Sequence, residues 1–306
     1  MSAISLQTLP FGTDAARRLA ARLGLACDEI ALHRFPDGEL RVAVAPVADT
    51  TILYTPLDQP NDKLIALLFA AEALRRGGAK RLVLVAPYLC YMRQDIAFHA
   101  GEAISQHAIG TLLATTVDRI VTVDAHLHRT PDIGAVFPGI EAANLSAMPA
   151  IADALAAAGI DPATIIIGPD AESKPWVKDL AGRLGLQHTV ARKFRRGDRS
   201  VEIHFADAAI LAGRPALMTD DIVSSGTTLM VAAKALKALG ATSIDAVITH
   251  ALFPPAMVAA FADAGIRSVR STDSVPHPTN AIALDETLAA ALRSELSKTP
   301  LPETTP

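Results

Sequence analysis

Short apolar segments rich in β-branched residues alternate with longer helical segments along most of the chain. We predict the apolar segments 52–55, 81–86, 119–123, 164–167, 215–219 and 244–249 as strands. They are continuously apolar, which is typical of strands that helices cover on both faces. Strands and helices that follow each other in this way predict parallel sheets of the α/β class.

Two of the helices between these strands have readable ends. One begins near Asn61 and ends at Gly77 and Gly78, because glycine is the usual residue just past a helix C-terminus. Its core-facing side chains are Leu64, Leu67, Leu68, Ala71 and Leu74. Another helix runs from about Thr227 to Leu239 and ends at Gly240.

Two segments depart from this plan and predict antiparallel hairpins. The first spans 30–45, with the turn FPDGE at 35–39 between its strands. The second spans 187–205 and has residues 195–198 at its tip. We therefore expect each α/β domain to carry a small hairpin excursion.

The length of 306 residues corresponds to about two domains. The segment 131–149 is rich in Pro and Gly and is the weakest seam, so we place the boundary there. The predicted domains are 1–145, joined by a C-terminal helix near 285–298, and 146–284. Strands near 83 and 165 each lead into a polar loop, and strands near 121 and 217 each end at an aspartate. We expect two similar domains.

Charge and cysteine content exclude some classes of protein. The 28 basic and 32 acidic residues give a net charge of −4, which argues against a dedicated nucleic-acid binder because such proteins rely on a basic surface. Cys27 and Cys90 stand alone in sequence and predict reduced thiols. Residues 1–11 do not read as a secretory signal, and the apolar run 64–71 is shorter than the roughly 20 residues of a membrane helix. We expect a soluble cytoplasmic protein without nucleic-acid or membrane partners.

The segment ALMTDDIVSSGTT at 216–228 carries the strongest chemical signal. Asp220 and Asp221 follow an apolar strand and can accept hydrogen bonds from the hydroxyls of a sugar. The next helix begins just after, where unpaired backbone N–H groups suit a phosphate. The residues that would surround that phosphate are Ser224, Ser225, Gly226, Thr227 and Thr228. The alternative interpretation is an ordinary capped helix after a polar turn, and the acidic pair before the turn argues against it.

This segment resembles the phosphoribosyl diphosphate-binding motif of type I phosphoribosyltransferases and of ribose-phosphate diphosphokinases. Other segments resemble the diphosphokinase family alone and occur in its order. They are FPDGE at 35–39, PYLCYMRQD at 87–95, VDAH at 123–126 and GPD at 168–170. The resemblance covers about two-thirds of the chain. It implies two phosphoribosyltransferase-like domains, each with a mainly parallel sheet flanked by helices, and a ribose 5-phosphate site in the C-terminal domain.

The resemblance also implies the reaction. In that family the anomeric hydroxyl of ribose 5-phosphate attacks the β-phosphorus of Mg-ATP, and AMP leaves. Catalysis of this kind depends on positioning and on stabilising negative charge. The chain has no G-x-x-x-x-G-K-[ST] loop, so other groups must meet the phosphates. The resemblance assigns the Mg²⁺ ion to His126 and Asp170. A histidine at a strand end is otherwise more often structural, and we expect His128 to be a surface residue.

A basic segment at 192–199 offers the cationic groups. Five of its eight residues are Lys or Arg, and Lys193 and Arg195 fit the Lys-x-Arg pair that closes over the diphosphoryl group in the family. A compact ammonium and a planar guanidinium suit oxygens on adjacent phosphates. The alternative is a solvated basic hairpin.

The resemblance assigns ATP to two segments. Arg93, Gln94 and Asp95 would contact its phosphates and adenine. Phe35, Asp37 and Glu39 would reach the adenine of a neighbouring subunit, which would make the active unit a dimer or a multiple of dimers. The alternative is that Phe35 folds back onto its own core. We expect His250 and His277 to be core or loop residues.

The resemblance is incomplete at three places. Residues 171–174 are AESK where the family has small, glycine-rich residues, Ile96 and Ala97 replace a basic pair, and Ser224 and Ser225 replace Asp-Thr. These departures leave phosphate activation and ADP inhibition open. Two other functions remain as alternatives: a phosphoribosyltransferase, and a non-catalytic regulatory homologue that binds nucleotide or sugar phosphate.

Overall fold

The computed structural model describes residues 4–196, 200–205 and 208–297, and it gives only the backbone of 192–196, 200–204 and 208. The chain divides into two compact units, and we describe each by itself. Unit 1 comprises 1–145 and 284–306, and unit 2 comprises 146–283. Among the described residues, no helix combines the length and the apolar character that a membrane span requires.

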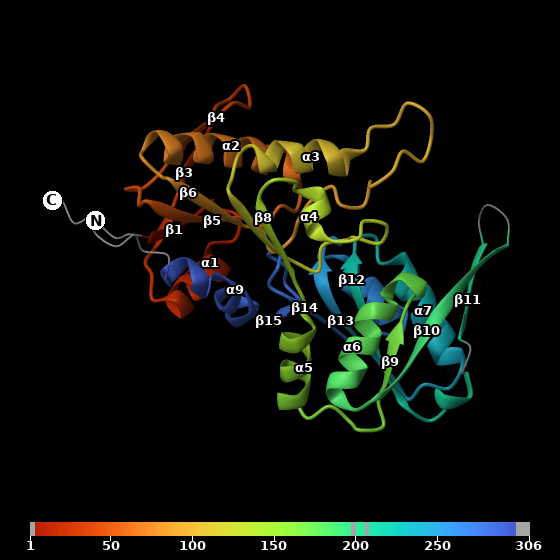
Figure 1. Cartoon of the computed structure of the whole chain (residues 1–306). Coiled ribbons are helices and arrows are strands. Elements are labelled where there is room, and N and C mark those ends of the chain that lie inside the picture. Colours follow the sequence, from red (N-terminus) through yellow and green to blue (C-terminus); the bar gives the residue numbers. More distant parts are fainter. Residues whose placement is uncertain (1–3, 197–199, 206–207, 298–306) are drawn as a thin grey trace. The chain divides into compact units, whose positions relative to one another are not determined.

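Unit 1 is built on a six-stranded sheet in the order β2-β1-β5-β6-β7-β8 (Figure 1), in which all neighbours are parallel. Its strands are β1 (Ile4–Thr8), β2 (Cys27–Glu29), β5 (Thr50–Tyr54), β6 (Arg81–Val85), β7 (Arg119–Val123) and β8 (Glu141–Leu145). In β5, β6 and β7 every residue after the first is buried. Their apolar, β-branched residues therefore form the centre of the core.

Helices cover both faces of this sheet. Figure 1 shows α2 (Pro60–Arg76) and α3 (Ser105–Ala114) over one face, and α1 (Thr13–Leu23) and α9 (Asp285–Ser297) over the other. The short helix α4 (Ile133–Val136) packs beside α3. The predicted stripe of α2 faces the core: four of its five side chains are buried, and Leu68 is partly buried. The C-terminal segment thus returns to unit 1, and α9 packs against α1.

The first predicted hairpin is confirmed. Strands β3 (Ala31–Arg34) and β4 (Leu40–Ala43) pair antiparallel, and β4 lies against α2. The turn is closed by hydrogen bonds from the Phe35 amide to the Glu39 carbonyl, 2.8 Å, and from the Gly38 amide to the Phe35 carbonyl, 2.9 Å. Gly38 has φ +94°, a conformation that favours glycine.

Unit 2 has a seven-stranded sheet in the order β11-β10-β9-β12-β13-β14-β15. Its strands are β9 (Ile165–Gly168), β10 (Gln187–Arg196), β11 (Ser200–Phe205), β12 (Pro215–Val223), β13 (Ser243–Ala251), β14 (Ser268–Thr272) and β15 (Asn280–Ile282). All neighbours are parallel except β10 and β11, which form the second predicted hairpin.

The helices of unit 2 are α5 (Met148–Ala157), α6 (Lys174–Leu184), α7 (Thr227–Ala238) and α8 (Met257–Asp263), with short 3₁₀ turns at Ala171–Ser173 and Ala208–Ile210. One core cluster joins β9, β12 and β13 to α7, whose buried side chains are Leu229, Ala232, Ala233 and Leu236. This cluster fixes the start of α7 relative to the strand that precedes it.

The six predicted strands are all confirmed, as is the two-part α/β fold. Both predicted helices are also confirmed, with ends one residue from those expected. One boundary is wrong in a way that bears on function: β12 continues to Val223, so Asp220 and Asp221 lie within the strand rather than after it. Strands β1, β2, β8, β14 and β15 were not predicted.

Candidate active site

The strand order of unit 2 defines where a ligand can bind. From β9 the chain crosses to β10 on one side, whereas from β12, the other neighbour of β9, it crosses to β13 on the opposite side. Ligands of open α/β sheets bind at the carboxyl ends of strands at such a switch point. Asp170 follows β9, and Asp220, Asp221 and the loop 224–226 lie at the end of β12. The topology therefore gathers the predicted ribose 5-phosphate residues and Asp170 at one edge.

Three carboxylates concentrate negative charge at this edge. The pKa of Asp220 is raised well above its usual value, first by burial and then by the charges of Asp221 and Asp170. Asp221 is buried as well. Because like charges close together disfavour ionisation, this cluster is suited to a bound cation or to hydrogen-bond donors such as sugar hydroxyls.

Because β12 continues to Val223, the backbone of Asp220 and Asp221 is held in the sheet. Asp220 is level with Ile248 of β13, and pairing resumes at Ile222 and His250. The Asp221 amide also donates a hydrogen bond to Oδ1 of Asp220, 3.2 Å. The apolar pattern predicted the end of β12 before this pair, because the polar residues at a functional edge interrupt the pattern although the backbone continues to pair.

The loop between β12 and α7 exposes its hydroxyl groups. Ser224, Ser225 and Thr227 are exposed, and the hydroxyls of Ser225 and Thr227 lie 3.2 Å apart. Gly226 precedes α7 with φ +71°, and a Cβ there would lie 2.4 Å from Cε1 of the buried Phe261. Only glycine satisfies both the backbone conformation and the close approach to the ring.

Asp170 holds the start of the next helical turn. Its Oδ1 accepts the Glu172 amide, 3.1 Å, and the Ser173 hydroxyl donates to its carbonyl, 2.6 Å. The residues 171–173, which depart from the family pattern, form a 3₁₀ turn. The carboxylate thus keeps a defined position although its flanking sequence differs.

The predicted catalytic pair lies on the long hairpin of unit 2. Lys193 and Arg195 belong to β10, where Lys193 is level with Ile203 and Arg195 with Val201 of β11. Their side chains, and residues 197–199 of the tip, lie outside the described part of the structure.

The carboxyl edge of the sheet of unit 1 is marked by unusual backbone conformations. Among the described residues, three other than glycine have positive φ: Gln59 at 44°, Tyr91 at 62° and Asp124 at 38°. They lie in the loops that follow β5, β6 and β7. Such residues cluster at functional sites because the surrounding structure must enforce them. The apolar pattern of the sequence carries no sign of these conformations.

The segment 93–95 is divided between exposed and buried side chains. Arg93 is exposed and Gln94 partly exposed, whereas only 4% of the Asp95 side chain is exposed. Asp95 accepts a hydrogen bond from Nη1 of Arg129 at 2.7 Å. Arg93 and Gln94 are thus accessible to solvent, whereas the carboxylate of Asp95 is turned to an internal partner. Arg129 was not among the predicted site residues.

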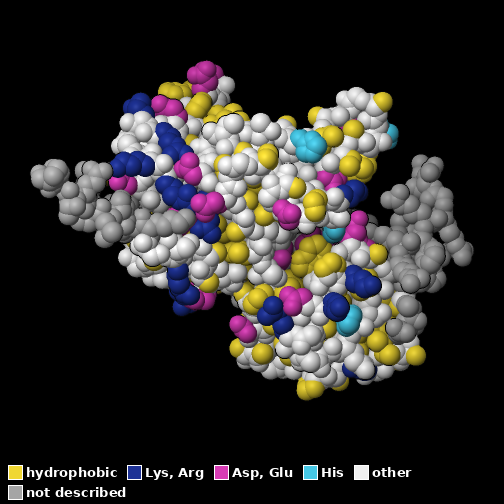
Figure 2. All heavy atoms as spheres, viewed as in Figure 1, with side chains coloured by type: hydrophobic (Ala, Val, Ile, Leu, Met, Phe, Trp, Pro, Cys, Tyr) yellow, Lys and Arg dark blue, Asp and Glu magenta, His cyan; other side chains and the backbone are white. Residues whose placement is uncertain are grey.

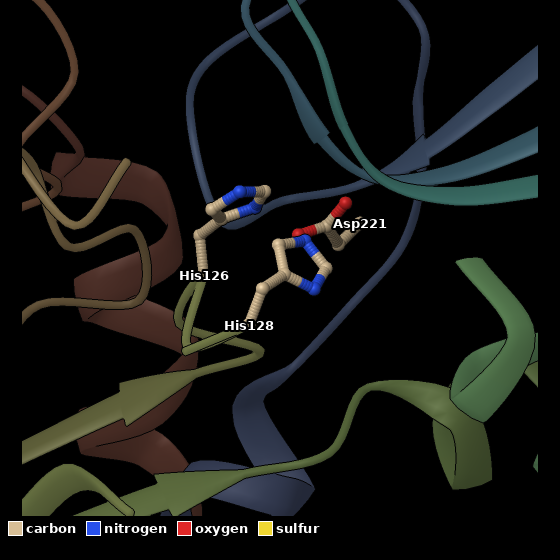
Figure 3. Close-up of side chains that lie close together, drawn as sticks. All are labelled: His126, His128 and Asp221. Carbon is tan, nitrogen blue, oxygen red and sulfur yellow. The ribbon is translucent and has the colours of Figure 1, made fainter. Parts of the chain in front are cut away.

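His126 and His128 lie on the loop after β7. Figure 3 labels both of them, together with Asp221 of β12. The two rings meet edge to face with centroids 3.9 Å apart. Both side chains are partly buried. The prediction of His128 as a surface residue is therefore wrong, because its ring packs against that of His126.

The hairpin turn of unit 1 presents Phe35, Asp37 and Glu39 to solvent. Phe35 is 38% exposed, and its ring packs edge-on against His33 at 4.7 Å between centroids. The Glu39 amide donates to Oδ1 of Asp37, 3.1 Å, so Asp37 also stabilises the turn. The alternative in which Phe35 folds back into the core is wrong.

The predictions for His250 and His277 agree with the structure. His250 is buried, with its Nδ1 2.8 Å from the Ser274 hydroxyl, and His277 lies in a loop. On the face shown in Figure 2, basic and acidic side chains are interspersed.

Comparison with known proteins agrees with this arrangement. Residues 5–116 match the N-terminal domain of ribose phosphate pyrophosphokinase, and residues 144–283 match the phosphoribosyl transferase domain. The chain is 30% identical to the ribose-phosphate pyrophosphokinase of Methanopyrus kandleri, over 92% of this chain and 96% of that protein. It is 32% identical to ribose-phosphate pyrophosphokinase 2 of Archaeoglobus fulgidus, over 90% of this chain and 94% of that protein.

The fold agrees with that of a solved relative. The crystal structure of phosphoribosylpyrophosphate synthetase from Mycobacterium smegmatis is similar with a TM-score of 0.83. The match has 24% sequence identity and covers 97% of this chain and 99% of that chain. Both family domains, in order and over nearly the whole length, show that the chain belongs to the ribose-phosphate pyrophosphokinase family.

Proposed function

We propose that the chain transfers the β,γ-diphosphoryl group of Mg-ATP to the 1-hydroxyl of ribose 5-phosphate. The products are 5-phosphoribosyl 1-diphosphate and AMP. A new bond forms between O1 of the sugar and the β-phosphorus, the bond from that phosphorus to the α,β-bridging oxygen breaks, and the proton of the hydroxyl is released. The observation that carries this proposal is family membership along both units, because the loop of unit 2 alone would equally suit a phosphoribosyltransferase.

Ribose 5-phosphate is assigned to the carboxyl edge of β12. Its phosphate would accept hydrogen bonds from the exposed hydroxyls and the backbone amides of 224–228 at the start of α7. Its ring hydroxyls would donate to Asp220 and Asp221. The raised pKa of Asp220 supports this role, since hydroxyl donors would stabilise a charge that the protein alone does not offset.

The residues at this edge also fit a magnesium ion. Mg²⁺ takes oxygen ligands and keeps some waters, so one or two carboxylates and the substrate phosphates suffice. When bound, it would neutralise charge that builds on the phosphate oxygens. Asp170 is the carboxylate we assign to it, since the negative field among Asp170, Asp220 and Asp221 is of the kind a divalent cation relieves. In unit 1, His126 on the loop after β7 stays a separate candidate metal ligand that the family resemblance suggests, although nitrogen is a less usual donor to Mg²⁺.

Arg93 and Gln94 are assigned to ATP, and Lys193 and Arg195 to the transferring diphosphoryl group. The exposure of Arg93 supports its role. Asp95 stays assigned to the ATP-binding segment with Arg93 and Gln94, and its burial and its ion pair with Arg129 support a role in holding that segment.

Product identification tests the proposal. Purified protein, Mg-ATP and ribose 5-phosphate are mixed, and AMP, ADP and phosphoribosyl diphosphate are quantified. We expect equal amounts of AMP and phosphoribosyl diphosphate. Ligand binding without turnover would favour the regulatory homologue, and turnover only with phosphoribosyl diphosphate and a base would favour a phosphoribosyltransferase. Asp170→Asn should be inactive, whereas Asp179→Asn, in an exposed i,i+4 pair on α6, should retain activity.

We further propose that Phe35, Asp37 and Glu39 complete the ATP site of a second copy of the chain. Their exposure on a hairpin turn supports this, because an exposed aromatic side chain at a turn has no role in its own core. The test mixes two inactive variants, Phe35→Ala and Lys193→Ala, under conditions that exchange subunits. In a two-fold dimer, mixing should restore about a quarter of full activity. A mixture that stays inactive would show that each chain uses its own turn.

A further inference from the structure

We infer that Arg129 and Gln106 are positioning residues that fasten the ATP-binding segment 92–95 to the loop that carries His126. All the groups involved belong to unit 1. The fastening itself is independent of the reaction, whereas its consequence for ATP rests on the proposed function.

The first link is the ion pair between Arg129 and Asp95. Nη1 of Arg129 lies 2.7 Å from Oδ1 of Asp95, whose side chain is 4% exposed. The guanidinium carbon of Arg129 also lies 5.4 Å from the centre of the Phe98 ring. Arginine therefore bridges a buried carboxylate and an aromatic face. Both are interactions in which guanidinium is favoured over a simple ammonium.

The second link is the side chain of Gln106, at the start of α3. This residue is 2% exposed. Its Nε2 donates to the Met92 carbonyl at 3.4 Å, and its backbone amide donates to the Gln94 carbonyl at 3.2 Å. Its Oε1 accepts the Thr130 hydroxyl at 3.0 Å. Gln106 thus holds the carbonyls on either side of Arg93, one through its side chain and one through its backbone amide, and its side chain also reaches the loop after β7.

The two links make one frame from two loops. Arg129 and Thr130 are adjacent, and they bind opposite ends of the frame, Asp95 and Gln106. His126 lies three residues before Arg129. Two residues with positive φ flank the linked segments: Tyr91 directly precedes 92–95, and Asp124 directly follows β7. A displacement of one loop would therefore carry the other with it, because the buried side chains of Asp95 and Gln106 would otherwise lose hydrogen bonds that bridge the two loops.

This frame has a specific functional consequence. Arg93, which meets ATP in the proposed function, has its backbone held between two bonded carbonyls. His126, the candidate metal ligand, lies on the loop at the other end. Loss of the frame should therefore weaken ATP use and leave ribose 5-phosphate use unchanged, because the latter is assigned to unit 2.

The first test is hydrogen–deuterium exchange on the ligand-free protein. In Arg129→Ala and in Gln106→Leu, amides of 92–98 should exchange about tenfold faster than in the wild type, since the first removes the partner of the buried Asp95 and the second the side-chain bond to the Met92 carbonyl. Arg76→Ala, which removes an exposed i,i+4 pair with Glu72 on α2, is the matched control and should leave 92–98 unchanged. Unchanged exchange in both frame variants would overturn the inference whether or not the proposed reaction occurs.

The second test is steady-state kinetics. In Arg129→Ala the KM for ATP should rise about ten- to a hundredfold, as for other residues that orient direct ligands, while the KM for ribose 5-phosphate stays within about twofold. Arg129→Lys should recover part of the loss, and adding Asp95→Ala to Arg129→Ala should cost little more. Equal loss for both substrates, or full additivity, would contradict a positioning role. Absence of turnover in the wild type would refute the proposed function and leave the exchange result to decide the frame.

Discussion

The ligand-free fold disfavours the charged form of Asp220. Burial and the charges of Asp221 and Asp170 raise its pKa. An unfolded chain leaves it near the ordinary value of about 3.9. The contribution of this group to the free energy of unfolding is therefore greatest below a pH of about 3.9. It is lost as the pH rises from that value through the raised pKa of the folded state.

The direction of this pKa shift leads to a first prediction. Asp220→Asn should stabilise the ligand-free protein at pH 7.5 by on the order of 1 kcal/mol, as other substitutions that relieve strained active-site charge do, and should abolish activity. The gain should shrink as the pH falls toward about 3.9, because below that value the wild-type carboxyl is protonated in both the folded and the unfolded state. Urea unfolding at several pH values measures it. Asp263→Asn, at an exposed position of α8, is the control, and an equal or lower stability of Asp220→Asn at pH 7.5 would contradict the prediction.

Gly226 joins a backbone requirement to a packing requirement. Gly226→Ala should reduce the free energy of unfolding by about 3 kcal/mol, since it combines a positive φ with a contact on the Phe261 ring. Gly265→Ala shares the positive φ but meets only the flexible Lys237 side chain at 3.6 Å, and it should cost about 1 kcal/mol. Chemical denaturation compares the two. Equal costs would mean that the ring yields and that the close approach is not what selects glycine.

At the scale of elements, the central strands were predictable because they are buried on both faces and therefore continuously apolar. Strands β2 and β8 lie at the two edges of their sheet, and β14 and β15 lie at one edge of theirs. They carry polar and partly exposed residues, such as Asp28, Asn144 and Arg270, so local pattern does not mark them. Each of them forms hydrogen bonds with a neighbouring strand that lies further inside the sheet.

The helix α9 ties the C-terminal segment to unit 1 by a buried carboxylate. Glu295 has no exposed side-chain surface, and its oxygens lie 2.8 Å from Nε of Arg81 and 2.6 Å from Nη1 of Arg119. The bond from Glu295 also raises the pKa of the Arg81 guanidinium. Sequence pattern predicted this helix but not its partner groups, which are more than 170 residues away.

Loss of this carboxylate should leave two arginines without their shared partner. We expect Glu295→Gln to lower the free energy of unfolding by about 3 kcal/mol, the cost of breaking a buried ion pair. Glu286→Gln, on the exposed side of α9, should cost less than about 1 kcal/mol. Denaturant titration measures both, and similar small effects would show that α9 is held by its apolar face alone.

At the scale of the whole molecule, the chemistry-bearing residues of unit 2 were predictable because they are consecutive or follow predicted strands. Asp220 to Thr228 lie in one segment, and Asp170 follows β9. The partners of the segment 93–95 were not predictable in this way. Arg129 and Gln106 reach it from other elements, and a lone arginine or glutamine in a sequence gives no sign of such a contact.

A kinetic measurement tests the role proposed for the hairpin of unit 2. Lys193→Ala should lower kcat about a hundred- to a thousandfold, the usual loss when one group that stabilises transition-state charge is removed, and should leave the KM for ribose 5-phosphate within about twofold. Lys234→Ala, at an exposed position of α7, should behave as the wild type. Matched losses in kcat and in ribose 5-phosphate affinity would mean that the hairpin binds the sugar rather than the transferring group.

The central claim is that the two phosphorus atoms move together. The direct measurement uses ATP labelled separately at the α-, β- and γ-phosphorus, with ribose 5-phosphate as acceptor. We predict that the β and γ labels appear together in phosphoribosyl diphosphate, that the α label remains in AMP, and that no ADP forms. Label transfer from the γ-phosphorus alone, with ADP as the product, would contradict the assignment of this chain as a diphosphokinase.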